Sequence, residues 1–393
     1  MVTRQEKDAL RRLMERVSAI AASSENQAKA AHWRRYFAGT PSSEDPEGPM
    51  FTMDIGIPTW ARILGFDLRR FYGDTLTQIR YSLLARIWQH ENLGDDTLVA
   101  QTIGINPVGT VLEPSMLGVE IGFPPDVEPW ALHDRAVVEE EADLDRLTLP
   151  DFYTAGAMPA VHRMYREACD LVNELEGDAW KVHFPGAIRG VLGLAQAMRG
   201  PHENIIMDML LRPAFAQRLF QFVTDFHCHY YRQRCAFLGE PLGLGHIGND
   251  EVNVPFISPA LYEEFLLPYE IRISTFHGGL SCWHSCGTTT PLLGLIRRIP
   301  NIKQFYTGPW TDVDAVMETF GGDTPIMIAV NTVDDILAAT PEHMAAKIRE
   351  LMARCRGAAL HIRGGAMNSA FDLQADLAQM RRWTRIAREV IRG

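Results

Sequence analysis

The stretch LSCWHSCGTTTPLLGLIRRIPNIKQFYTG, residues 280–308, holds two short apolar segments with a helical pattern between them. Residues 280–286 and 302–308 are predicted strands, and the apolar spacing predicts a helix over 289–298. A helix that connects two strands brings the second strand back in the same direction, so the pair is predicted to be parallel.

This alternation continues on both sides of the stretch. The further predicted strands are WKVHFPG, PLGLGHI, PIMIAVN and AALHIRGG, and the further predicted helices cover 157–176, 190–199, 203–238, 259–277 with a kink at Pro268, 311–320, 341–356 and 372–391. At least six such repeats, without a nucleotide-binding fingerprint, favour a closed (β/α)8 TIM barrel over an open sheet.

The N-terminal part has a different pattern. Helices are predicted over 5–36 and 74–91, with a loop rich in Gly, Pro and Ser at 39–49. We therefore expect an N-terminal helical extension over residues 1–90, followed by a single catalytic barrel domain over residues 91–393.

The composition limits the classes of function. The 393 residues are 46% hydrophobic and 22% charged, which is typical of a globular protein. The net charge of −11 and the lack of a basic stripe argue against nucleic acid as the main partner. The six cysteines are irregularly spaced, which does not indicate a disulfide framework. No run of ~18 apolar residues occurs. We expect a cytoplasmic protein without membrane attachment.

Polar residues end or follow the predicted strands, and in a TIM barrel this is where active sites lie. These residues are His183, His246, Asn249, Asp250, Glu251, His284, Cys286, Tyr306, Asn331, His361 and Arg363. A single residue of this kind more often satisfies a backbone group than performs chemistry. Their recurrence over six successive units favours a shared site.

His284 and Cys286 give the sharpest signal. Side chains alternate along a strand, so both project to the same side. Histidine and cysteine are both residue types that commonly bind zinc. Two ligands do not hold zinc. Cys282 shares the face but lies about 6–7 Å further down the strand, whereas Asp250 or Glu251 could supply oxygen. A buried cysteine beside a hydrogen-bonded histidine is the structural alternative.

GLGHIG, residues 243–248, fits the pattern G-x-G-x-x-G. A dinucleotide site requires a helix to begin directly after the glycines. The segment NDEVNVPFISP that follows has the composition of a loop. The sequence therefore does not predict a dinucleotide cofactor.

Several segments in order resemble the uroporphyrinogen decarboxylase superfamily, and within it the methyltransferases that work with corrinoid proteins. They are NLGDDTL, EEADLDRLTLPD, RGPHENIIMDMLLRP, ISPALYEEFLLPYEIRI, HSCGTTTPLLGLI, YTGPWTDVDAVMETFGGDTPIMIAVN and ATPEHMAAKIRELM. The resemblance runs from about residue 90 to the C-terminus and implies a (β/α)8 barrel. The arginine-rich motif with which the true decarboxylases bind their acidic tetrapyrrole is replaced by MDIGIPTWARI, which argues against that substrate.

The resemblance implies a methyltransferase that moves a methyl group between a methylated small molecule or thiol and a cobalamin on a partner corrinoid protein. It also implies a zinc ion and a homodimer. The expected catalytic residues are Asp250, Glu251 and His246; the expected substrate-binding residues are His183, Asn249, Tyr306, Asn331 and Arg363; the expected metal ligands are His284, Cys286 and Glu251. The branch usually has another cysteine near the last strand, where this chain has Gly365 and Ala366.

Two other functions remain open at this point. One is a metal-independent decarboxylase or lyase, in which Arg363 would bind a small carboxylate and Asp250 would stabilise developing positive charge. The other is a binding barrel without catalytic activity. Metal content separates the first alternative from the methyltransferase.

Overall fold

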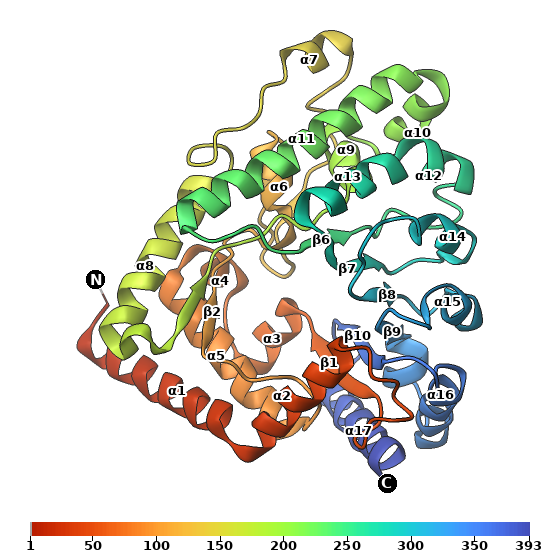
Figure 1. Cartoon of the computed structure of the whole chain (residues 1–393). Coiled ribbons are helices and arrows are strands. Elements are labelled where there is room, and N and C mark those ends of the chain that lie inside the picture. Colours follow the sequence, from red (N-terminus) through yellow and green to blue (C-terminus); the bar gives the residue numbers. More distant parts are fainter. Residues whose placement is uncertain (1) are drawn as a thin grey trace.

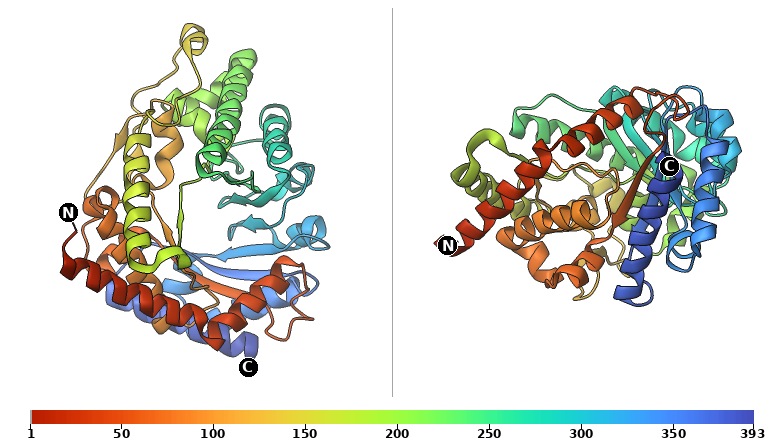
Figure 2. Two further views of the ribbon diagram at one scale, coloured as in Figure 1. Left: turned by 60° about the vertical axis from the view of Figure 1, so that its left-hand side comes forward. Right: turned by 90° about the horizontal axis from the view of Figure 1, so that it is seen from below.

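The computed structural model describes residues 2–393 and has the predicted (β/α)8 barrel, with helices around two parallel sheets (Figures 1 and 2). The larger sheet has six strands in the order β1-β10-β9-β8-β7-β6, and the smaller one pairs β2 with β5. The strands are β1 (Met50–Ile55), β2 (Thr102–Gly104), β5 (Lys181–His183), β6 (Gly245–Gly248), β7 (Leu280–Ser285), β8 (Phe305–Thr307), β9 (Ile326–Val330) and β10 (Leu360–Met367).

Alternation along β7 separates the hydrophobic core from the barrel interior. Trp283 faces outward, where its ring stacks on Phe305 at 5.5 Å, and Phe305 stacks on Phe320 of the helix α15 (Val313–Phe320). His284 faces the other way and stacks on Tyr306. The outward residues supply apolar burial, and the inward residues are free to carry polar chemistry.

The first seam between the two sheets lies between β1 and the segment that leads into β2. Asp96 N–H donates to the Phe51 carbonyl, and the Asp96 carboxylate accepts from Phe51 N–H at 2.9 Å. Asp95 accepts from Met53 N–H at 2.7 Å. Both aspartates are 1% exposed. Two buried carboxylates thus replace the backbone acceptors that a continuous ladder would supply.

The second seam lies between β6 and the segment after β5. Gly190 N–H donates to the Gly248 carbonyl, and Gly248 N–H donates to the Ile188 carbonyl. Glu113, on the short helix α6 (Leu112–Met116), accepts from Ile188 N–H at 2.6 Å and Arg189 N–H at 2.9 Å. Its side chain is buried. This carboxylate therefore fixes the segment that closes the barrel against β6.

Most helices agree with the sequence prediction: α5 (Thr75–Asn92), α8 (Met158–Glu176), α9 (Val191–Arg199), α16 (Pro341–Arg354) and α17 (Leu373–Arg392). Three predicted helices are divided, into α1 (Arg4–Ala22) and α2 (Ser24–Phe37), α10 (His202–Leu211) and α11 (Pro213–Leu238), and α12 (Pro259–Phe265) and α13 (Leu267–His277). Ser23 ends α1 and caps α2 by accepting from Asn26 N–H, and Pro213 and Pro268 lie in the first turns of α11 and α13. The helix expected over 289–298 is shorter: a 3-10 turn, Thr290–Leu292, leads into α14 (Leu293–Ile296).

The N-terminal 90 residues contribute to the barrel as well as to its surroundings. β1 pairs with β10 in parallel, and α3 (Ile57–Leu64) and α4 (Leu68–Gly73) follow it. The irregular segment 92–135 adds the two-stranded hairpin of β3 (Ile121–Gly122) and β4 (Trp130–Ala131). Among the described residues, none of the helices combines the length and apolar character that a bilayer crossing requires.

The closure by Glu113 makes a testable prediction. Glu113→Ala leaves two buried N–H groups without an acceptor, so we expect the free energy of unfolding to fall by roughly 2–4 kcal/mol. Urea unfolding followed by circular dichroism measures this loss. Glu120→Ala, at an exposed position near the same helix, is the control. Equal stabilities of the two variants would contradict the role of Glu113 in closing the barrel.

Candidate active site at the strand ends

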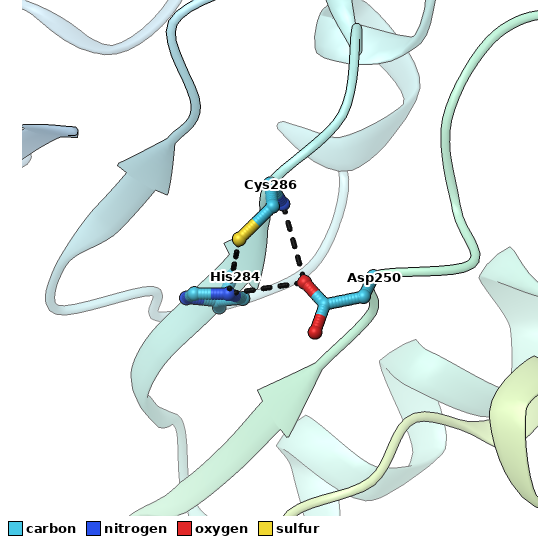
Figure 3. A group of neighbouring side chains, drawn as sticks. All are labelled: Asp250, His284 and Cys286. Carbon is cyan, nitrogen blue, oxygen red and sulfur yellow. Dashed lines mark hydrogen bonds and ion pairs between the residues drawn. The ribbon is translucent and has the colours of Figure 1, made fainter. Parts of the chain in front are cut away.

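Asp250, His284 and Cys286 converge at the C-terminal ends of β6 and β7 (Figure 3). His284 Nε2 lies 3.1 Å from Asp250 Oδ1 and 3.2 Å from Cys286 Sγ. The backbone N–H of Cys286 also donates to Asp250 Oδ1 at 3.3 Å. The sequence prediction that an imidazole, a thiol and an acid from separate strands share one place therefore agrees with the geometry.

The strand register explains the convergence. Gly248 of β6 lies opposite His284 of β7, so Asp250, two residues later, leaves β6 beside the imidazole. Cys286 follows the last residue of β7 on the same face as His284, as the two-residue spacing requires. Cys282 lies on that face too, but it is buried against Tyr306 and Ala329 below the group.

Tyr306 and Arg363 complete the wall beside the imidazole. The Tyr306 ring stacks on His284 with a centroid distance of 3.9 Å and an interplanar angle of 15°, and its hydroxyl lies 3.7 Å from Cys286 Sγ. The Arg363 guanidinium lies over the Tyr306 ring, 5.5 Å from its centroid. Arg363 also forms an ion pair with Asp54 of β1. The tyrosine thus restricts the rotation of His284.

The electrostatics of the group favour a charged acid and a neutral thiol. Burial raises the pKa of Asp250, but hydrogen bonds with His284 and Cys286 outweigh it and hold the pKa at about 2. Burial and the negative charge of Asp250 raise the pKa of Cys286 to about 11. At neutral pH the group therefore contains a carboxylate beside a protonated thiol.

His246 of β6 lies opposite Cys282 of β7, two residues before the strand position of His284. Burial and the neighbouring His284 lower the pKa of His246 to about 4. The imidazole is therefore neutral at pH 7, with one nitrogen able to donate and the other able to accept a hydrogen bond. This is the state required to hold a substrate group or to take up a proton.

The donor set fits a zinc ion. A single imidazole nitrogen faces both a carboxylate oxygen and a thiol sulfur, although it can donate only one hydrogen bond. In a tetrahedral zinc site, neighbouring ligand atoms lie roughly 3.3–3.6 Å apart, and His284 Nε2 lies 3.1 Å from the Asp250 oxygen and 3.2 Å from the Cys286 sulfur. An ion bound to all three would satisfy each of them and leave a fourth position open.

The other predicted residues lie away from this group. Glu251 Oε1 accepts from Arg189 at 3.2 Å, so its carboxylate is directed to the second seam and not to His284. Asn249 is fully buried behind the strands and is inaccessible to a substrate. The Asn331 side chain accepts from Val333 and Asp334 N–H and caps a helical turn. We therefore revise the expected ligand Glu251 and the expected substrate contact of Asn249.

Two histidines of the strand-end series are also distant. His183 is exposed on β5, with Lys181 and Glu240 as its charged neighbours. His361 lies deep in the barrel, where Nε2 and the Thr52 hydroxyl are 2.8 Å apart. A side chain added at Gly365 would meet Thr332 Oγ1, and the Ala366 side chain lies outside the described part of the structure. The position of the family's further cysteine therefore holds a closely packed glycine.

The sequence prediction missed Asp54. Its strand, MFTMDI, alternates apolar residues (Phe51, Met53 and Ile55) with polar ones (Thr52 and Asp54), which is the pattern of a half-buried strand. The sequence prediction contains no strand at this position, so it does not include Asp54 as the partner of Arg363. The ion pair offsets the positive charge that would otherwise attract a substrate carboxylate.

The thiol pKa leads to a test by alkylation. In the metal-free protein, thiolate formation at Cys286 follows a pKa of about 11, so its reaction with iodoacetamide is slow at pH 8 and accelerates as the pH rises. Asp250→Asn removes the negative charge that raises this pKa, so we expect the rate at pH 8 to increase about tenfold. Peptide mapping by mass spectrometry follows Cys286. An unchanged or slower rate would contradict the predicted coupling.

Comparisons with known proteins agree with this architecture. The family model described as uroporphyrinogen decarboxylase (URO-D) matches residues 103–389. A solved structure of a methyltransferase from Methanosarcina mazei has the same fold, with a TM-score of 0.60 and 13% sequence identity over 87% of this chain and 93% of that one. No curated protein matches the sequence. The chain belongs to the uroporphyrinogen decarboxylase family.

Proposed function

We propose that this protein is a methyltransferase that moves a methyl group between a methylated small molecule or thiol and a corrinoid carried by a partner protein. The observation that carries the proposal is the group of His284, Cys286 and Asp250 at the strand ends of a uroporphyrinogen decarboxylase family barrel. The likeness of the fold to a methyltransferase supports the same class of reaction.

Zinc is the proposed metal, with His284, Cys286 and Asp250 as its ligands. As a Lewis acid, the bound ion would bind a thiol as its thiolate or polarise the heteroatom that carries the methyl group. The aspartate takes the charge that a second cysteine would contribute, because carboxylate and thiolate each carry one negative charge. The ion and its two anionic ligands are then neutral overall.

The surrounding residues have roles that follow from their positions. Tyr306 holds the imidazole plane of His284 by stacking. The neutral His246, below the group, would hold or accept a proton from the substrate. Arg363, paired with Asp54, would orient a polar substrate group by hydrogen bonding without adding net charge. The proposal keeps the expected roles of His246 and Arg363, whereas Tyr306, expected to bind substrate, is assigned a positioning role because its ring stacks on His284.

A cavity with space for a small molecule lies beyond the ends of β1 and β10. It has a volume of about 760 Å³ between the start of α3, the β3–β4 hairpin and the segment after β10, and it is lined in part by Pro58, Glu128, Trp130 and Asn368 but not by the proposed metal ligands. Burial raises the pKa of Glu128, and the charge of Asp54, the partner of Arg363, raises it further. The cavity volume is typical of a small-molecule site.

The metal-independent lyase has less support. It requires Arg363 to attract a substrate carboxylate by its charge, whereas Asp54 already offsets that charge. It also gives no reason for a thiol, an imidazole and a carboxylate to converge. The methyltransferase proposal accounts for both the Arg363–Asp54 pair and the convergence of the thiol, imidazole and carboxylate.

Methyl-transfer assays test the proposal directly. Purified protein with stoichiometric zinc is expected to move methyl groups between free cobalamin, as a surrogate for the partner, and a panel of small thiols and methylated compounds. His284→Ala and Cys286→Ala should each lower the rate at least about 100-fold, because each removes a ligand. Cys235→Ala, on α11, is the control. Full activity in the two ligand variants would contradict the metal role.

A second measurement separates the two acids. Asp250→Ala is expected to weaken zinc binding at least about tenfold, whereas Glu251→Ala should change it less than about threefold, because Glu251 pairs with Arg189. Competition with a chromophoric chelator measures both affinities. A larger loss in Glu251→Ala than in Asp250→Ala would restore the ligand set expected from the sequence.

A further inference from the structure

We propose that Glu270 is a positioning residue that sets the separation between Asp250 and His284 from behind the strands. The inference rests on the proposed metal site. Glu270 lies on α13, in the layer between the barrel and its helices, and its side chain is 1% exposed. It is therefore not in contact with a substrate.

The Glu270 carboxylate binds the neighbours of both proposed ligands. Oε1 accepts from Asn249 Nδ2 at 2.7 Å, and Oε2 accepts from Trp283 Nε1 at 2.9 Å. Asn249 directly precedes Asp250, and Trp283 directly precedes His284. One rigid group on α13 thus holds the ends of β6 and β7 together.

The two side chains that bind Glu270 each stand next to a proposed ligand that faces the mouth. On β7, alternation turns Trp283 to the helix layer and His284 to the mouth. After β6 ends, Asn249 bonds to Glu270 while Asp250 bonds to His284. A backbone hydrogen bond from Asn249 N–H to the His284 carbonyl, at 2.8 Å, joins the same two strand ends. A shift of either outward side chain would move the ligand next to it.

Asn249 has few other restraints. Its Oδ1 is buried and accepts no hydrogen bond among the described residues. This oxygen lies against Gly190, where an added Cβ would be 1.7 Å away. The side chain is therefore fixed by contact with the glycine on one side and by Glu270 on the other. The glycine belongs to the second seam, so the seam and the site share this contact.

A third donor provides an internal control. The Tyr262 hydroxyl donates to Oε2 of Glu270 at 2.7 Å, but Tyr262 lies on α12 and is not next to a proposed ligand. If Glu270 only stabilised the fold, the loss of any one of its three donors would affect the metal site to a similar extent. A positioning carboxylate affects the metal site only through Asn249 and Trp283.

Glu270→Gln tests the proposal with little change in shape. The amide oxygen can still accept from Trp283 and Tyr262, but the amide nitrogen then faces the Asn249 amide nitrogen, so Asn249 must turn. We expect Co²⁺ binding to metal-free protein to weaken at least about tenfold, with a changed thiolate-to-cobalt absorption band. Tyr262→Phe, which breaks a hydrogen bond to the same carboxylate, should remain within about twofold of wild type.

Two outcomes of the cobalt titration would overturn the proposal. One is wild-type affinity and an unchanged band in folded Glu270→Gln. The other is an equal loss of affinity in Tyr262→Phe, which would indicate a structural role alone. If Glu270→Gln does not fold, Trp283→Phe takes its place, because it removes the N–H donor and keeps a smaller ring to pack on Phe305.

A metal-free readout separates failure of this proposal from failure of the proposed function. If wild type binds no cobalt, the metal site is wrong, and crystal structures of metal-free wild type and Glu270→Gln then decide the positioning role. The separation of Asp250 Oδ1 from His284 Nε2 should increase by about 0.5 Å or more in the variant. An unchanged separation would overturn the positioning role.

Discussion

Buried carboxylates supply hydrogen bonds where the barrel's sheet is interrupted, and the positions of the strand ends depend on them. Asp95, Asp96 and Glu113 accept from backbone N–H groups at the two seams. A buried N–H without a partner costs roughly 1–3 kcal/mol, so each acceptor restricts the segment it binds to one place. The cost is that each carboxylate is itself desolvated, which raises the pKa of both Asp95 and Glu113.

The geometry of the candidate site depends on this closure of the barrel. Glu113 holds residues 188–190 against Gly248, and Gly190 in turn packs on Asn249. Asp250 follows directly, so its distance from His284 depends on a chain of contacts that begins at α6. All of these contacts are made by the protein's own residues, so the fold itself brings the side chains of the site together.

The sequence predicted the barrel well because its strands and helices are short, apolar and regularly alternating. β6 to β10 and the helices between them were predicted in order, the divided helices break at Ser23, Arg212 and Leu266, and the helix expected over 289–298 is reduced to a 3-10 turn and α14. β1 was missed, although its alternation is readable. The seam carboxylates and Glu270 were not predictable, since their partners are backbone groups and side chains distant in sequence. Local patterns carry no information about such pairs.

For the site, periodicity placed His284 and Cys286 on one face, but it could not choose between two adjacent acids. Asp250 and Glu251 follow the same strand, and their directions depend on the loop that begins at Asn249. The structure turns Asp250 to the imidazole and Glu251 to Arg189. If zinc binds Asp250 as proposed, the ligand shell would have a hard oxygen in place of the soft sulfur of a further cysteine, with the same charge. Since oxygen donates less electron density to zinc than thiolate does, the ion would polarise a bound heteroatom more strongly. Under the proposed function, a methylated oxygen or nitrogen compound would then be activated more readily than a thiol.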